Sequence, residues 1–205
     1  YQKIRSMIIG GRLKPGDPIN EVAIAEALGV SRTPVREAVK RIGDEGLVRV
    51  LAQTGTFVAP ISRADLEGAY FIRRALEMES ARRAAEKLTA EGVETLEDNI
   101  AAHRLAITRG RFARAIQLDD IFHRTIAEIC GFPVIWRAID ISKAQMDRGR
   151  YLAIPKAGYG EQTVEQHEAI LDALKQHDGE GAAKAMERHI ETSFRNALEV
   201  ADIPG

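Results

Sequence analysis

The first 60 residues alternate short apolar stripes with polar turns. Apolar residues at helical spacing predict three helices, over 1–9, 20–28 and 31–44. Asn20 and Ser31 are placed to cap the second and third helices. Two short runs of strand-forming residues follow, at 47–51 and 56–59, and the segment between them predicts a hairpin. Three helices followed by a hairpin indicate a winged helix-turn-helix domain over residues 1–60.

From Ser62 onward the apolar spacing is helical to the end of the chain, so the expected fold class is mainly α. The pattern predicts a bundle of about six helices over residues 61–205, at about 62–88, 90–108, 111–130, 133–150, 160–177 and 179–200. Tyr151 and Tyr159 flank a Gly/Pro loop at 154–160, which we interpret as a mobile loop or a gate. No apolar run approaches the length that spans a bilayer.

The third predicted helix carries its charges on one face. Arg32, Arg36 and Lys40 are spaced i, i+4, i+8, and the opposite face is apolar. A short helix that buries one face and presents arginines near its start suits the major groove of DNA. The alternative is a solvated face on which the arginines pair with Glu37 or Glu45.

The helix-turn-helix arrangement assigns DNA contacts to named residues. The first residues of the second helix read the groove, which points to Arg32 and Arg36 for bases or phosphates. Thr33 suits a phosphate or a thymine methyl group, and Ser31 with the helix N-terminus suits a phosphate. At the wing tip, the predicted contacts to the minor groove are Gln53, Thr54 and Gly55.

Composition supports one nucleic-acid-binding half. The 205 residues carry a net charge of −1, but residues 1–60 have an excess of three cations and the remainder an excess of four anions. The single cysteine, Cys130, excludes an internal disulfide and fits a cytoplasmic protein.

The second half contains a set of candidate metal ligands. Asp119 and His123 are i, i+4 on one helix face, while His167 and His189 lie near apolar positions of two later helices. Three imidazoles and a carboxylate suit a divalent ion such as Zn²⁺, Ni²⁺ or Mn²⁺. The alternative is a group of hydrogen-bonded core histidines. We expect the remaining histidines, His103 and His177, at the surface, and Cys130 and Trp136 in the core.

Several motifs closely resemble the GntR family of bacterial transcription regulators. They are Leu13-x-Pro15-Gly16, Glu21-x3-Ala25-x2-Leu28 through Ala38, Glu45-Gly46-Leu47-Val48 and Gly55-Thr56-Phe57-Val58. The helical half resembles the FCD ligand-sensing domain of the FadR branch. The resemblance implies a homodimer on a short inverted repeat of operator DNA, usually a repressor that responds to a small metabolite. Val22 departs from members with an arginine at this position, which implies fewer arginine contacts to DNA.

The same resemblance strengthens the metal hypothesis. FCD domains with a metal site carry an Asp-x3-His pair and two later histidines, and these positions hold Asp119, His123, His167 and His189. Arg73, in Arg73-x2-Leu76-Glu77, resembles the start of the FCD domain. It is the candidate partner for the carboxylate of a small organic acid effector, with a salt bridge to Glu77 as the alternative.

The preferred interpretation is a regulator and not an enzyme. A metalloenzyme fused to a DNA-binding domain is the rival from another class, because a three-histidine, one-aspartate site with an open position could activate water. A third possibility is a DNA-binding dimer whose metal ion is purely structural.

Overall fold

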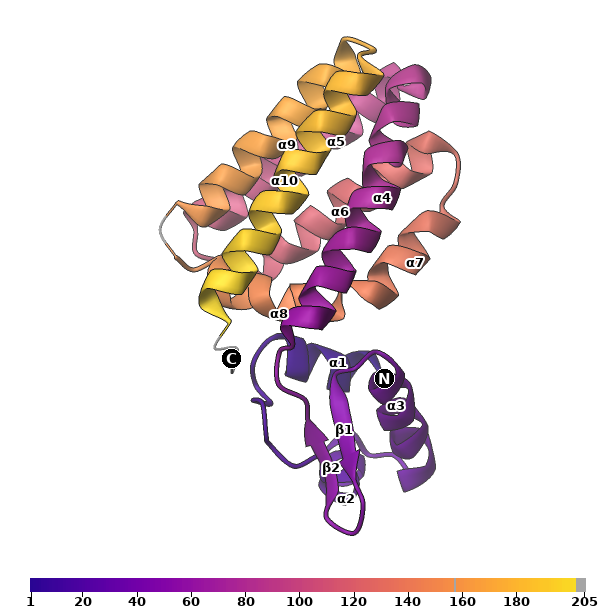
Figure 1. The fold of residues 1–205 in the computed structure, drawn as a ribbon, viewed down its shortest axis with the longest axis vertical. Helices are drawn as coiled ribbons and strands as arrows, with labels where there is room; N and C mark the ends of the chain where they lie inside the picture. Colours follow the sequence, from indigo (N-terminus) through magenta and orange to yellow (C-terminus); the bar gives the residue numbers. More distant parts are fainter. Residues whose placement is uncertain (157, 202–205) are drawn as a thin grey trace.

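The computed structural model has two parts that lie end to end (Figure 1). It describes residues 1–156 and 158–201, with Val200 by its backbone alone. Ala157, in the predicted loop at 154–160, lies outside the described residues. So do residues 202–205, at the end of the predicted 61–205 domain. The described chain is mainly helical with one small sheet, which confirms the predicted fold class. Among the described residues, no helix is long and apolar enough to cross a membrane.

The N-terminal part has the predicted winged helix-turn-helix order. Its elements are α1 (Gln2–Ile9), α2 (Glu21–Leu28), α3 (Arg32–Asp44), β1 (Val48–Leu51) and β2 (Gly55–Val58). The strands pair antiparallel, with Val48 opposite Val58. The side chain of Asn20 accepts hydrogen bonds from two backbone N–H groups of α2, so it is the predicted N-cap. Gly29 ends α2 in the left-handed conformation, at φ 64°.

One capping prediction in this part is wrong. Ser31 occupies the N-cap position of α3, but its side chain makes no capping hydrogen bond. A capping hydroxyl accepts from the N–H of the second or third helical residue. The third helical residue is Pro34, which has no N–H to donate. Ser31 therefore begins the helix by position, and its hydroxyl remains exposed.

The C-terminal part is a bundle in which a long last helix packs along a long first one. Its elements are α4 (Arg63–Lys87), α5 (Ala90–Thr108), α6 (Phe112–Cys130), α7 (Val134–Ser142), α8 (Ala144–Ala153), α9 (Tyr159–Lys175) and α10 (Gly179–Val200). α10 lies against α4 and α9, and α6 lies against α4 and α5. The core is small and aliphatic, with a few larger side chains such as Phe122 and Met186.

The predicted helix over 133–150 is in fact two helices, so the described residues form seven helices in this part instead of about six. The break falls at Lys143, whose side chain is buried. Its ammonium group contacts Asp147 at 2.5 Å, Asp120 at 3.1 Å and Asp140 at 3.7 Å. Three carboxylates on three helices therefore hold this cation at the corner, a charge arrangement that apolar periodicity does not reveal.

The other core predictions have mixed outcomes. Cys130 is fully buried, as expected. Trp136 is only half-buried, on the short α7, so its assignment to the core is wrong. Its ring instead faces the ammonium of Lys143, which lies 5.6 Å from the ring centroid. A partly exposed indole beside a buried cation is a favourable arrangement.

The short helix α8 lies between the bundle and the winged helix (Figure 1). Ala144, near its start, belongs to the apolar core of the winged helix, and Tyr151 packs against that core. On its other side α8 approaches α10 so closely that a Cβ on Gly149 would lie 2.5 Å from the Cβ of Ala197. α8 is thus in contact with both parts of the molecule.

Candidate metal centre and DNA-binding surface

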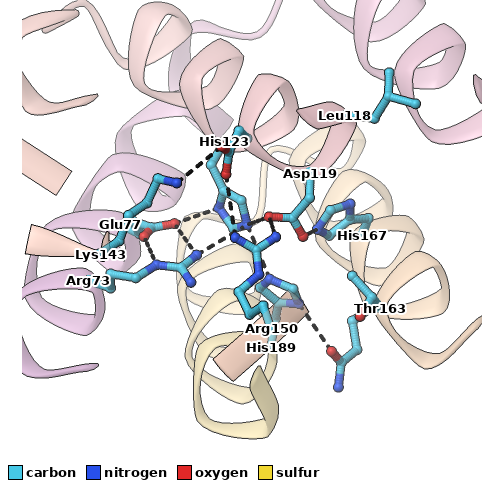
Figure 2. A network of polar contacts seen from close by, with 12 residues as sticks. Arg73, Glu77, Leu118, Asp119, His123, Lys143, Arg150, Thr163, His167 and His189 are labelled. Carbon is cyan, nitrogen blue, oxygen red and sulfur yellow. Dashed lines mark hydrogen bonds and ion pairs between the residues drawn. The ribbon is translucent and has the colours of Figure 1, made fainter. Parts of the chain in front are cut away.

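Four side chains from three helices converge inside the bundle (Figure 2). Asp119 and His123 come from successive turns of α6, His167 from α9 and His189 from α10. One potential ligand atom of each lies within 4.8 Å of the others, and all four residues are buried. The structure therefore brings together the complete set of ligands that the sequence predicted.

The spacing of these atoms suits one ion. His123 Nε2 lies 3.1 Å from His189 Nε2 and 3.6 Å from Asp119 Oδ2. His167 Nε2 lies 3.4 Å from Asp119 Oδ1. A tetrahedral ion with bonds of about 2.1 Å places its ligand atoms roughly 3.4 Å apart. The observed separations match that geometry without large rearrangement.

Two neighbouring side chains orient the imidazoles. A carboxylate oxygen of Glu77 lies 2.5 Å from His123 Nδ1. The amide oxygen of Gln166 lies 3.1 Å from His189 Nδ1. Each contact favours a proton on Nδ1 and leaves the lone pair of Nε2 directed at the centre. Such supporting contacts fix the tautomer and the ring orientation of metal-binding histidines.

Electrostatics keep the ligands in the protonation states that a metal requires. Burial lowers the pKa of His167 and holds the pKa of His189 well below its usual range, so both rings are neutral. Burial alone would raise the pKa of Asp119. The charge of Arg150 and the nearby histidines outweigh this and hold that pKa well below its usual range. The cluster therefore offers neutral nitrogens and an ionised carboxylate.

The cluster contains polar atoms that the protein itself does not satisfy. His167 is fully buried, and neither of its ring nitrogens has a hydrogen-bond partner among the described residues. The ring of His167 stacks on Phe122 with a centroid distance of 3.9 Å, which fixes its plane. A buried polar group without a partner is costly. A divalent cation would bind the Nε2 atom and remove that cost, so the residues present fit such an ion.

Two arginines border the cluster from different helices. Arg73, on α4, donates from Nε to Glu77 at 2.6 Å, which is the salt bridge of the alternative interpretation. Its Nη2 lies 3.4 Å from His123 Nε2, and its buried Nη1 has no partner among the described residues. Arg150, on α8, contacts the carboxylate of Asp119 (Figure 2). The predicted arginine thus lies beside the metal ligands, and a second one contacts a ligand directly.

The prediction that His103 lies at the surface is wrong. His103 is fully buried on α5, with its ring centroid 5.4 Å from that of His167. Burial lowers its pKa to about 3, and neither nitrogen has a partner among the described residues. Its polarity suggested exposure, but it occupies an inward position of α5. His177, in contrast, is exposed as expected.

A small cavity adjoins the cluster. Its free volume is about 30 Å³, and its lining includes Asp119, Arg150, Thr163, His189, His103 and Asn196. A volume of this size holds about one water molecule. Any larger ligand requires side chains of α8, α9 or α10 to move.

Sequence reasoning missed three of these residues, namely Gln166, Arg150 and His103. Gln166 directly precedes a predicted ligand, and one turn of helix offers no reason for it to reach His189 on another helix. Arg150 was hidden because α8 was not separated from α7. His103 could have been found from its spacing, since it lies three residues after Ile100 and three before Ala106, both buried on α5.

The predicted DNA-binding side chains lie together on one exposed surface. Ser31, Arg32, Thr33 and Arg36 are exposed on the first turns of α3, opposite a buried face that includes Val35. The side chain of Arg36 is 70% exposed, and its nearest carboxylate is Glu21 of α2 at 3.6 Å. An exposed pair of this length holds an arginine weakly. The guanidinium groups are therefore accessible to DNA.

The wing tip projects from the same part. Gln53, Thr54 and Gly55 are exposed between β1 and β2. Gln53 has a positive φ of 61°, and Gly55 has φ 134°, a conformation that side-chain-bearing residues rarely adopt. The tight turn thus needs glycine at Gly55 and presents bare backbone at the tip of the hairpin.

A winged helix with an exposed basic helix, joined to a helical bundle with a buried ligand cluster, defines the class of DNA-binding regulators with a sensing domain. Comparison with known families agrees with this. Residues 1–58 match the model of bacterial regulatory proteins of the gntR family, and residues 67–192 match the FCD domain. The chain belongs to the GntR family of transcription regulators, with an FCD domain.

Individual relatives support the same class. The chain is 35% identical to the HTH-type transcriptional repressor RspR of Escherichia coli over 98% of this chain and 88% of that protein. It is 32% identical to an HTH-type transcriptional regulator of Streptomyces ambofaciens, over 95% of this chain and 81% of the other. The fold matches E. coli McbR/YncC with a TM-score of 0.83 at 23% identity, covering 97% and 94% of the two chains. These similarities identify a DNA-binding transcription regulator and not an enzyme.

Proposed function

We propose that this protein is a homodimeric repressor whose binding to an inverted repeat of operator DNA is controlled by a small organic acid, held at a metal ion in the FCD domain. The observation that carries the proposal is the convergence of Asp119, His123, His167 and His189 in a buried cluster with unsatisfied nitrogens. The ion is Zn²⁺, Ni²⁺ or Mn²⁺, because neutral imidazoles with one carboxylate suit these metals. The DNA-binding role places the protein in the cytoplasm.

The effector carboxylate would bind beside the ion. Three histidines and one aspartate leave at least one coordination position free, and a bound ion would supply a Lewis-acidic centre for an anion there. Arg73 is positioned to add a charged hydrogen bond, because its unpartnered Nη1 lies in the buried surroundings of His123. The cation and the arginine together select for negative charge.

Effector binding would reach the DNA-binding domain through α8. The cavity beside the metal ligands is too small for an organic acid, so Arg150 and its helix must shift to admit one. α8 also contacts the winged helix through Ala144 and Gln145. A shift of α8 would therefore change the position of α3, and operator affinity depends on the separation of the two recognition helices in a dimer.

A second copy of the chain would cover an exposed apolar surface on the bundle. This surface, the α4–α7 face, consists of side chains on two helices that pack together, namely Phe71, Ile72, Val134 and Ile141. Exposed apolar side chains gathered on adjacent elements mark interaction sites. Two copies are also what an inverted repeat requires, since each half-site takes one recognition helix.

The DNA assignment is tested with an operator selected from a random DNA pool by the wild-type protein. Arg32→Ala combined with Arg36→Ala is expected to abolish the mobility shift. The matched control removes two exposed arginines from the bundle, by Arg63→Ala with Arg195→Ala, and should leave binding unchanged. Equal binding by the two double variants would show that α3 does not read the operator.

The sensing assignment is tested by metal analysis and a thermal-shift screen of small organic acids on the metal-loaded protein. The expected result is an acid that raises the melting temperature and changes operator affinity only when metal is present. If metal removal lowers the melting temperature and no acid affects DNA binding, the ion is structural and the proposed switch is wrong.

A further inference from the structure

A second cavity lies between the two parts of the molecule, away from the metal cluster. Its volume is about 320 Å³, at the lower end of the range of small-molecule sites. One wall comes from the end of α1 and the loop that follows it, and the other comes from α8. Most of the lining is aliphatic or aromatic, contributed by Ile8, Ile9, Leu13, Ile61, Tyr151 and Leu152.

One charged residue in this lining is unusual. Arg148 is only 4% exposed, yet no carboxylate of the described residues forms an ion pair with it. Its one hydrogen bond to another side chain goes to the neutral amide oxygen of Gln145, at 3.0 Å. Burial lowers its pKa to about 10, and no neighbouring charge offsets that effect. The other buried arginines, Arg73 and Arg150, both have carboxylate partners.

A buried guanidinium without an anion is an incomplete arrangement. Charged groups almost never lie inside a protein unless they are paired, because desolvation of the ion is costly. Lys14 also lines the cavity, and it is exposed, so a second cation stands at the rim. An apolar chamber with one buried cation is complementary to a ligand that carries one negative charge and an apolar body.

We propose that this interdomain cavity is a second ligand site, which binds an amphipathic monocarboxylate with its carboxylate on Arg148 and its hydrocarbon body against α1 and α8. A carboxylate suits the planar fork of arginine and neutralises a single buried charge. A phosphate dianion would leave excess negative charge in the chamber. The proposal does not depend on the metal site, because neither Arg148 nor the rest of the lining contacts the metal ligands.

The position of the site gives it a route to the DNA-binding domain. Gln145, the partner of Arg148, donates its amide N–H to the backbone oxygen of Gly46 at 2.8 Å. Gly46 lies in the turn that follows α3. A ligand that engages Arg148 would thus act one side chain away from a contact between α8 and the recognition-helix domain.

The test uses the full chain in the presence of EDTA, so that the metal site cannot contribute. Octanoate is the probe, and 1-octanol is its uncharged match, each titrated by calorimetry. We expect one octanoate per chain and binding of octanol about tenfold weaker or less, since a charge-assisted hydrogen bond contributes at least that factor. Absence of saturable octanoate binding would overturn the proposal, and would be the result if a carboxylate of a second subunit already occupies Arg148.

Variants locate the binding. Arg148→Met is expected to weaken octanoate binding by about tenfold or more, and Arg148→Lys to restore most of it. Arg195→Met, which removes an exposed arginine from α10, is the matched control and should bind like the wild type. Unchanged affinity in Arg148→Met would refute the assignment.

A second variant covers the possibility that Arg148→Met fails to fold. Leu152 is 50% exposed and lines the cavity, so Leu152→Trp fills the chamber from its rim with little effect on folding. It should also weaken octanoate binding by about tenfold or more, by the loss of apolar contact area. Wild-type affinity in a folded Leu152→Trp protein would exclude this cavity as the site.

Discussion

The side-chain amide of Gln145 donates a hydrogen bond to the backbone oxygen of Gly46, at 2.8 Å, and so joins the bundle to the turn after the recognition helix. Five residues further along the same helix, Arg150 contacts the carboxylate of Asp119 in the metal cluster. α8 is a helix of ten residues, so these two contacts lie within about two turns of each other. A single rigid element therefore connects the candidate sensing site with the DNA-binding domain.

Gln145→Met should uncouple the two parts while it leaves the metal cluster intact. Loss of one partly buried hydrogen bond costs about 1 kcal/mol in the free energy of unfolding. The larger effect expected is on communication, because the factor by which bound metal and effector change operator affinity should fall toward one. Mobility shifts with and without these ligands measure that factor, and metal titration checks that the site is unchanged.

The control for this variant is Gln176→Met, since Gln176 is an exposed glutamine at the end of α9. It should keep the wild-type response of operator affinity to ligand. If Gln145→Met also keeps that response in full, α8 does not transmit the signal through Gly46.

Zinc should stabilise the protein through His167. An ion at a concentration of about 100 times its Kd adds roughly 2.7 kcal/mol to the free energy of unfolding. For a chain of this size, that corresponds to an increase in melting temperature of roughly 5–10 °C. His167→Ala removes a buried ligand and should eliminate most of this increase. A thermal melt with zinc and with EDTA measures it.

His177→Ala is the matched loss of a histidine outside the cluster. His177 is exposed, although its Nδ1 lies 2.7 Å from the backbone oxygen of Ala85. The variant is expected to melt at a somewhat lower temperature than the wild type but to retain the full zinc-dependent increase. A zinc-dependent increase of wild-type size in His167→Ala would contradict the assigned ligand set.

Much of the fold could be predicted because local patterns agree with the final packing. Asn20 and Gly29 mark the ends of α2 by conformational preferences that act within a few residues. The corner at Lys143 could not be predicted in this way. Its position depends on Asp120, which is distant in the sequence and becomes a neighbour only after the bundle has formed.

The metal cluster was predictable to a different extent. Asp119 and His123 share one helix, so their spacing alone places them on one face. The convergence of His167 and His189 with that pair depends on how three helices pack, and family resemblance supplied this information where periodicity could not. Arg150 remained hidden for the same reason, because its contact with Asp119 spans two helices that the sequence does not align.

Phe71→Arg should dissociate the proposed dimer. The residue is 71% exposed and lies on the α4–α7 face, where an apolar side chain of this size has no partner in the single chain described here. A buried arginine without a partner would be costly in a dimer interface. The expected result by light scattering is a mass of one chain in place of two. Leu105→Arg, at a residue 50% exposed on α5, is the control and should remain dimeric.

Gly149→Ala and Gly68→Ala should change stability in opposite directions. In helix interiors alanine is favoured over glycine by roughly 0.8–1.0 kcal/mol. At Gly68 on α4 a Cβ would meet nothing within 4 Å, so the free energy of unfolding should rise by about that amount. At Gly149 the new Cβ would lie 2.5 Å from the Cβ of Ala197 and 3.1 Å from its Cα. Relief requires α8 and α10 to separate, and overpacking of this kind costs typically 1–3 kcal/mol. Gly149→Ala should therefore be destabilised in denaturant titration despite its better helix propensity. Stabilisation of both variants would mean that the close approach of α8 to α10 does not exist in solution.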